Sequence, residues 1–295
     1  MPTTILAMVG VVAMWIPDFL RVEEGLCDLI ITLSVAIINS LLVVLLLHRG
    51  GVIRTMSGFP AFLYLLLVGT FPQVHMSWTG QLVVLLILLV LLRMQRTSQS
   101  VVVQEHAFLS GVLLGVATLL QQEMILGVLV VWLFLFFERQ FTFKSFFAPI
   151  LGWGVVVFLY AVAGYLGWIE LGEFPTIRLH WIGEHTDTPE LIMVGFLVVM
   201  MVVTGVMAFA NVTREGLRVR AMLNAIALWA ILSLVFVLLF GQMVLLTMFL
   251  AMCAIVLTLY AYINQTPLHG GIMLFTILSL LSIYVVNNFV LLINI

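Results

Sequence analysis

The feature that most constrains this chain is a succession of long apolar segments separated by short polar turns. Of its 295 residues, 64% are hydrophobic and 8% are charged, whereas soluble domains are about 45–50% apolar and about 25% charged. A hydrocarbon core about 30 Å thick takes about 20 apolar residues per helix. The sequence therefore predicts an all-α, polytopic transmembrane helix bundle, and it excludes a soluble globular domain.

The apolar segments predict about eleven spans within one integral membrane domain over residues 1–295. Their polar boundaries give the ranges 4–16, 29–47, 56–71, 79–92, 107–120, 124–137, 145–168, 191–210, 221–240, 242–263 and 271–293. Because no Lys or Arg precedes the first range, we expect it to be a retained span rather than a cleaved signal peptide. The stretch 107–137 can alternatively form a single long, tilted helix.

The basic residues test this arrangement, because Lys and Arg collect in the cytoplasmic loops of membrane proteins. With a cytoplasmic N-terminus, nine of the eleven basic residues are cytoplasmic, namely Arg49, Arg54, Arg93, Arg96, Arg139, Lys144, Arg214, Arg218 and Arg220. A single helix over 107–137 would put whole groups of them on the opposite side. The hairpin of two short helices is therefore preferred, and the C-terminus is predicted to be periplasmic.

The turn of this hairpin carries Gln121, Gln122 and Glu123. Each arm has about fifteen residues and so is about 22 Å long, which is shorter than the hydrocarbon core. The turn can therefore lie below the outer surface, with Glu123 as a candidate catalytic carboxylate and the two amides as candidate substrate-binding groups. The alternative is a polar turn that reaches water.

The first outer loop places Asp18, Glu23 and Glu24 directly after the first span. Membrane glycosyltransferases that use polyprenyl-phosphate donors place a catalytic acid in their first outer loop, and this chain is similar to them in that position alone. These three acids are therefore further candidate catalytic residues. The alternative is an ordinary solvated loop.

The longest outer loop covers residues 169–190 and contains a candidate interfacial helix at 175–182. A proline begins this segment, a glycine follows it, and its apolar residues recur at helical spacing, as expected for a helix lying flat on the membrane. Arg178 is a candidate phosphate or carboxylate ligand, and His180 and Trp181 are candidate substrate-binding residues. The histidines and acids of this loop match no strong metal motif, so the sequence assigns no metal site and no cofactor.

Small and polar residues inside the spans indicate contacts between helices. Ala107, Gly111 and Gly115 recur every four residues, a pattern that lets two membrane helices approach closely. Polar side chains within spans are expected to hydrogen-bond across helices, and those singled out are Ser34, Asn39, Ser40, Asn287 and Asn288.

Four segments resemble an uncharacterised family of polytopic inner-membrane proteins of Bacteroidota. They are 108–111 (FLSG), 115–119 (GVATL), 138–144 (ERQFTFK) and 148–152 (APILG). The shared pattern is a glycine-containing span, a short helical hairpin, an Arg-x-Phe inner loop and a further span. The resemblance implies the inner (cytoplasmic) membrane of a Gram-negative bacterium, and it supplies no activity and no catalytic residue.

Three functions are compatible with these features. The leading interpretation is an accessory or scaffold component of envelope biogenesis, with membrane lipids and other membrane proteins as partners and no nucleic acid. The second is a polyprenyl-phosphate-dependent glycosyltransferase or glycan polymerase that uses the outer acids, with Arg178 on the phosphate. The third is a transporter of a lipid or uncharged solute, because the charged residues fall in loops or at span ends rather than at the depth where ion-coupled transporters place them.

Overall fold

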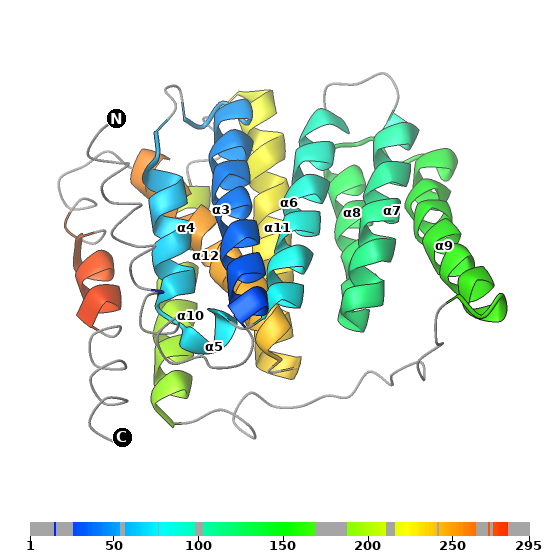
Figure 1. The fold of residues 1–295 in the computed structure, drawn as a ribbon. Coiled ribbons are helices and arrows are strands. Elements are labelled where there is room, and N and C mark those ends of the chain that lie inside the picture. The colour runs from blue at the N-terminus through cyan, green and yellow to red at the C-terminus, as the bar shows by residue number, and fades with distance from the viewer. Residues whose placement is uncertain are drawn as a thin grey trace.

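The computed structural model describes residue 15 and residues 26–53, 57–75, 77–97, 103–168, 188–210, 216–240, 242–263, 271 and 274–282. Regular structure in this part of the chain is entirely helical (Figure 1). The elements are α3 (Leu26–Arg49), α4 (Phe59–Gly69), α5 (Pro72–His75), α6 (Trp78–Thr97), α7 (Val103–Leu120), η2 (Gln122–Leu126), α8 (Gly127–Phe137), α9 (Phe143–Tyr165), α10 (Thr188–Phe209), α11 (Leu217–Phe240) and α12 (Met243–Ile263). Residues 274–282 are also helical.

Seven of the described helices are long and apolar enough to cross a membrane, namely α3, α6, α7, α9, α10, α11 and α12. Two apolar segments are shorter, Phe59–Gly69 and Gln122–Phe137. The protein is therefore a multi-pass helical membrane protein. Most of the predicted first and last spans, 4–16 and 271–293, lies outside the described residues, so the number of eleven spans stays a prediction.

Helix α4 is shorter than the span predicted at 56–71. It begins with Pro60 in its first turn and covers 11 residues, which is about 16 Å of helix. Proline is well accommodated at the start of a helix. Pro72 then disfavours the helical conformation at the residue before it, and the chain continues as the separate short helix α5. Two prolines thus set both limits of α4.

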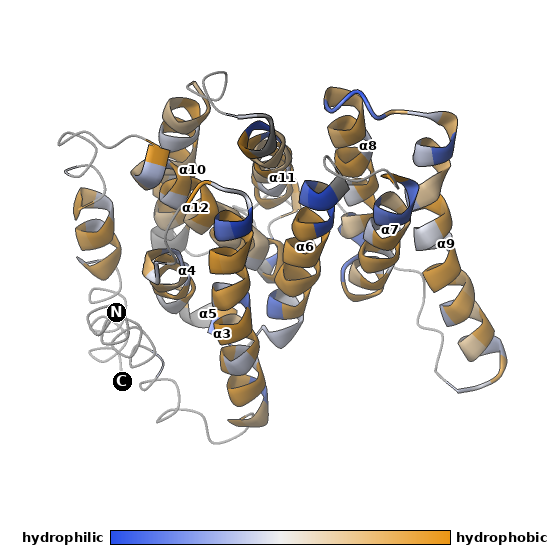
Figure 2. Ribbon diagram, turned by 90° about the horizontal axis from the view of Figure 1, so that it is seen from above, coloured by the Kyte–Doolittle hydropathy of each residue, from blue (hydrophilic) through white to orange (hydrophobic). Residues whose placement is uncertain are grey.

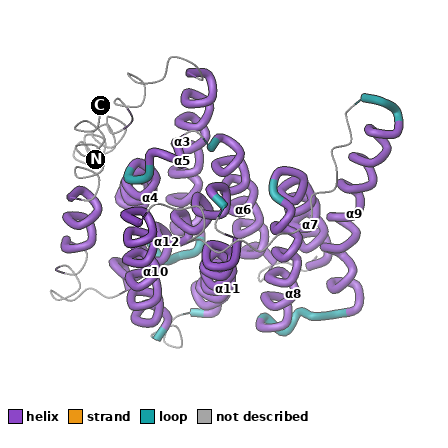
Figure 3. The backbone as a smooth tube through the Cα atoms, turned by 90° about the horizontal axis from the view of Figure 1, so that it is seen from below, coloured by secondary structure: helices purple, strands orange, loops and turns teal. Residues whose placement is uncertain are grey.

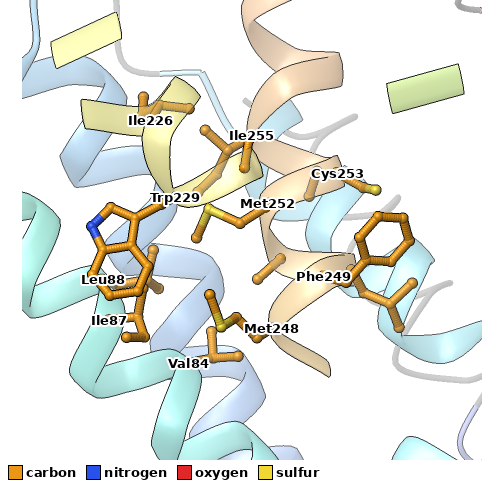
Figure 4. Close-up of a cluster of buried hydrophobic side chains, with 14 of the residues drawn as sticks. Val84, Ile87, Leu88, Ile226, Trp229, Met248, Phe249, Met252, Cys253 and Ile255 are labelled. Atoms are coloured by element: carbon orange, nitrogen blue, oxygen red, sulfur yellow. The ribbon is translucent and has the colours of Figure 1, made fainter. Parts of the chain in front are cut away.

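Helix α12 lies at the centre of the bundle, in contact with α4, α6, α10 and α11 (Figure 3). Of its most apolar 18-residue stretch, 83% is buried, against 17% for α9. The sequence explains this position, because α12 carries no charged residue and a helix that is apolar all round favours burial. Figure 4 shows the resulting core, where Leu88 of α6, Trp229 of α11 and Met252 of α12 meet.

Helices α7, α8 and α9 extend the bundle on one side, beyond α6 and α11 (Figures 1 and 2). The contact of α7 with α9 depends on glycine. A Cβ atom at Gly111 would lie 2.6 Å from the Cα atom of Pro149, and one at Gly152 would lie 2.8 Å from the main-chain nitrogen of Val112. The predicted close approach is therefore confirmed at Gly111 and Gly115, where a Cβ atom on Gly115 would lie 2.8 Å from Val156 Cβ, and α9 is the partner helix. Ala107 is buried, and its approach to α9 stays a prediction.

The stretch 107–137 forms two helices rather than one, so the predicted hairpin is confirmed. Helix α7 ends at Leu120, and Gln121 has an extended backbone with φ −149° and ψ 113°. The chain then reverses through η2 into α8, which packs against α7. In Figure 1, α3, α6 and α8 end on the side where α7 and α9 begin. Figure 2 shows this side, with polar residues at the helix ends and apolar residues along the helices.

Candidate functional site

Two turns on the other side of the bundle bring Gln121, Glu123 and Gln242 together, and we call these residues the amide–carboxylate cluster. The first two belong to the α7–α8 turn, and Gln242 immediately precedes α12. The start of α8 packs tightly against both neighbouring helices, because a Cβ atom at Gly127 would lie 2.8 Å from Leu114 of α7 and 2.9 Å from Trp229 of α11. This packing holds the two turns in contact.

Hydrogen bonds connect all three side chains of the cluster. Gln121 Nε2 donates to Glu123 Oε2 and to Gln242 Oε1. Gln242 Nε2 donates to Glu123 Oε1 at 3.1 Å. Glu123 is 4% exposed, whereas the two glutamines are partly exposed. Both carboxylate oxygens of Glu123 thus accept hydrogen bonds from amides. The hydrogen bond from Gln242 to Glu123 Oε1 connects the two turns, and these two residues are 119 positions apart in the chain.

This geometry gives Glu123 a structural role. Each of its carboxylate oxygens accepts one amide hydrogen and keeps a second lone pair. A buried carboxylate is costly unless its oxygens are hydrogen-bonded, and the two amides meet that need. The arrangement is that of a cross-link between two turns.

The structure brings together only part of the predicted site. Gln121 and Glu123 are in contact, and Gln122 lies partly buried at the first position of η2. The remaining candidates lie outside the described residues, namely Asp18, Glu23, Glu24, Arg178, His180 and Trp181, together with the predicted interfacial helix at 175–182. Gln242 was not predicted, because nothing in its local sequence connects it to a turn formed so much earlier in the chain.

A second buried polar group, which we call the α3–α4–α6 triad, consists of Asn39, Tyr64 and Gln81. Tyr64 donates its hydroxyl hydrogen to Gln81 Oε1 at 2.6 Å. Asn39 Nδ2 donates to the same oxygen at 3.1 Å and to the main-chain oxygen of Gln81 at 2.9 Å. All three residues are fully buried. The triad therefore joins three helices through one glutamine side chain.

The sequence predicted part of this triad. The expectation that Asn39 hydrogen-bonds across helices is confirmed, but for Ser34 and Ser40 it is wrong. Their hydroxyls donate at 2.7 Å to the main-chain oxygens of Ile30 and Ile37 in their own helix, because a serine hydroxyl can reach the preceding turn. Asn287 and Asn288 lie outside the described residues. Gln81, an amide inside the predicted span 79–92, was the signal that could have completed the triad.

A polar contact also occurs on the side of the bundle opposite to the cluster, where α8 ends and α11 begins. Asn224 Nδ2 donates to Glu138 Oε1 at 3.5 Å. Burial raises the pKa of the Glu138 carboxyl above its ordinary value, while the hydrogen bond from Asn224 and the charge of Arg220 act in the opposite direction. Within the part of the chain that the structure describes, no three His, Cys, Asp or Glu side chains gather as a metal site would require.

Comparison with known proteins adds no identity to this geometry. No protein family, curated protein or solved structure matches the chain. The class of the protein, a multi-pass helical membrane protein, therefore rests on its sequence and its structure.

Proposed function

We propose that this chain is an accessory, non-catalytic membrane protein that serves as a scaffold in envelope biogenesis in a bacterial inner membrane. The observation that supports this proposal most directly is the amide–carboxylate cluster. Glu123 is the one candidate catalytic acid among the described residues, and both of its carboxylate oxygens accept hydrogen bonds from within the protein. Hydrogen bonds of this kind connect the two turns and stabilise the bundle.

Replacement of Glu123 by leucine tests this proposal. We expect a loss of about 1 kcal/mol in the free energy of unfolding, because the buried ends of Gln121 and Gln242 lose an acceptor while their exposed parts can still reach water. Glu123→Gln should stay close to the wild type, since an amide oxygen can still accept one of the two hydrogen bonds. Thermal unfolding of the purified protein in detergent measures both changes.

If Glu123 is instead a catalytic acid, Glu123→Leu should not lower the stability of the protein. Residues held in an active site for chemistry often lower stability, and removing them often raises it. A Glu123→Leu protein that unfolds at the same temperature as the wild type, or at a higher one, would therefore contradict the structural role and reinstate Glu123 as a candidate catalytic acid.

We further propose that the N-terminus is cytoplasmic, which puts the cluster on the periplasmic side. Support comes from the described basic residues Arg49, Arg96, Arg139 and Lys144, which lie at the ends of α3, α6 and α8 and at the start of α9, on the side seen in Figure 2. Lys and Arg gather on the cytoplasmic side of membrane proteins.

Cysteine accessibility tests this orientation across one helix. Phe141 and Trp168 are exposed and lie on opposite sides of α9, which at 23 residues is about 34 Å long. In a cysteine-free background, we expect Trp168→Cys to react with a membrane-impermeant maleimide on intact inner-membrane spheroplasts, and Phe141→Cys to react only after permeabilisation. The opposite labelling would reverse the proposed topology.

A further inference from the structure

A groove opens between α10 and α11 on the flank of the bundle. Its volume is about 280 Å³, and its ten lining residues, which include Gly205, Phe209, Ala227 and Ala230, are all apolar. Val256 of the central helix α12 lies beneath it. The α10 wall runs from Met201 to Phe209, which is about 12 Å along a helix. The groove thus has the shape and the surface of a site for a linear apolar chain.

Small residues on both helices leave the space of this groove open. The ideal Cβ position at Gly205 has only ordinary contacts, the nearest being Val256 Cγ1 at 3.6 Å, and Ala227 on the facing helix is partly exposed. Larger side chains at positions 205 and 227 would fill this space. The hollow therefore follows from the sequence at these positions.

A basic residue of α11, Arg220, lies about two helical turns beyond the groove. Phe209 lines the groove and is the last residue of α10, so the groove reaches the end of that helix. Arg220 precedes Ala227 by seven residues, close to two helical turns, and so lies on the same face of α11. Arg220 also acts on the Glu138 carboxylate, but a guanidinium group has five donors.

An apolar groove with an arginine about two helical turns beyond it matches one class of membrane molecule. Basic residues at the end of a space between membrane helices attract anionic head groups, and arginine binds phosphate through paired hydrogen bonds. We propose that the groove between α10 and α11 holds one acyl chain of an anionic glycerophospholipid, with the phosphate at Arg220. A neutral lipid would lose the charge interaction.

Native mass spectrometry of the purified full-length protein tests the site. The probes are phosphatidylglycerol and phosphatidylcholine with identical acyl chains. We expect the wild type to retain one phosphatidylglycerol and to prefer it over phosphatidylcholine. Ala227→Trp fills the groove and should abolish this retention. Ala161→Trp, at an exposed position of α9 away from the groove, should retain the lipid as the wild type does.

Substitution of Arg220 tests the head-group contact separately. Loss of one basic contact is expected to lower the preference for phosphatidylglycerol about fivefold in Arg220→Gln. Arg220→Lys keeps the charge but not the paired hydrogen bonds, so its preference should lie between those of Arg220→Gln and the wild type. Equal retention of both lipids by the wild type would overturn the anionic head group. Unchanged retention in Ala227→Trp would overturn the groove as the site, and a dimer that this substitution dissociates would make a second copy the occupant.

Discussion

Gly111→Ala is expected to separate α7 from α9 and to be among the most damaging single-methyl changes in this chain. The added Cβ atom would lie 2.6 Å from the Cα atom of Pro149, and a backbone atom cannot move aside as a side chain can. Overpacking of a close contact costs about 1–3 kcal/mol, and membrane helices depend on such close packing for their association. Thermal unfolding of the purified protein in detergent measures the loss of stability.

Gly154 provides the matched control on the facing helix. A Cβ atom there would meet nothing within 4 Å, and alanine is a better helix former than glycine. Gly154→Ala should therefore be as stable as the wild type or slightly more stable. If Gly111→Ala and Gly154→Ala unfold alike, the close approach of α7 and α9 does not contribute as described.

Gln81→Leu is expected to destabilise the bundle by about 1–3 kcal/mol. Its side-chain oxygen accepts hydrogen bonds from both Tyr64 and Asn39, and leucine has nearly the same size without the acceptor. The Tyr64 hydroxyl would lose its acceptor in a fully buried position, whereas Asn39 would keep its bond to the main-chain oxygen of residue 81. Thermal or denaturant unfolding of the purified protein measures the effect.

A double variant separates lost hydrogen bonding from lost packing. Removing both partners of a buried hydrogen bond can be nearly neutral, whereas removing one leaves the other unsatisfied. The protein with both Tyr64→Phe and Gln81→Leu should therefore be more stable than the Gln81→Leu protein. If the double variant is no better, the damage comes from packing around residue 81, and the triad does not act through its hydrogen bonds.

Hydropathy was sufficient to predict the class of fold and most of its helices. The apolar runs located α3, α6, α9, α10, α11 and α12 within a few residues, since the thickness of the hydrocarbon core determines the length of a span. The parity of the basic loops also predicted the break between α7 and α8 correctly. In both cases the membrane imposes the constraint on each segment separately, so a single sequence reveals it.

Contacts between helices were predicted less completely, because the same apolar surface can pack against many partners. The spacing of Gly111 and Gly115 indicated a close approach but not that α9 would be the partner. Likewise, Glu123 was recognised as unusual, but its contact with Gln242 depends on the packing of α8 between α7 and α11. Such a contact depends on how all the intervening helices pack, so the sequence around either residue does not predict it.

The central position of α12 has a consequence for biosynthesis. The ribosome makes α3, α4, α6 and α10 before this helix, yet each of them packs against α12 or against a neighbour of α12 in the finished bundle. Contacts such as α7 with α9 and α3 with α6 join helices that are all made before α12, so they can form first. The faces of α4, α6 and α10 that contact α12 in the finished bundle are covered by lipid or by an insertion factor until α12 inserts, because membrane helices insert first and associate afterwards.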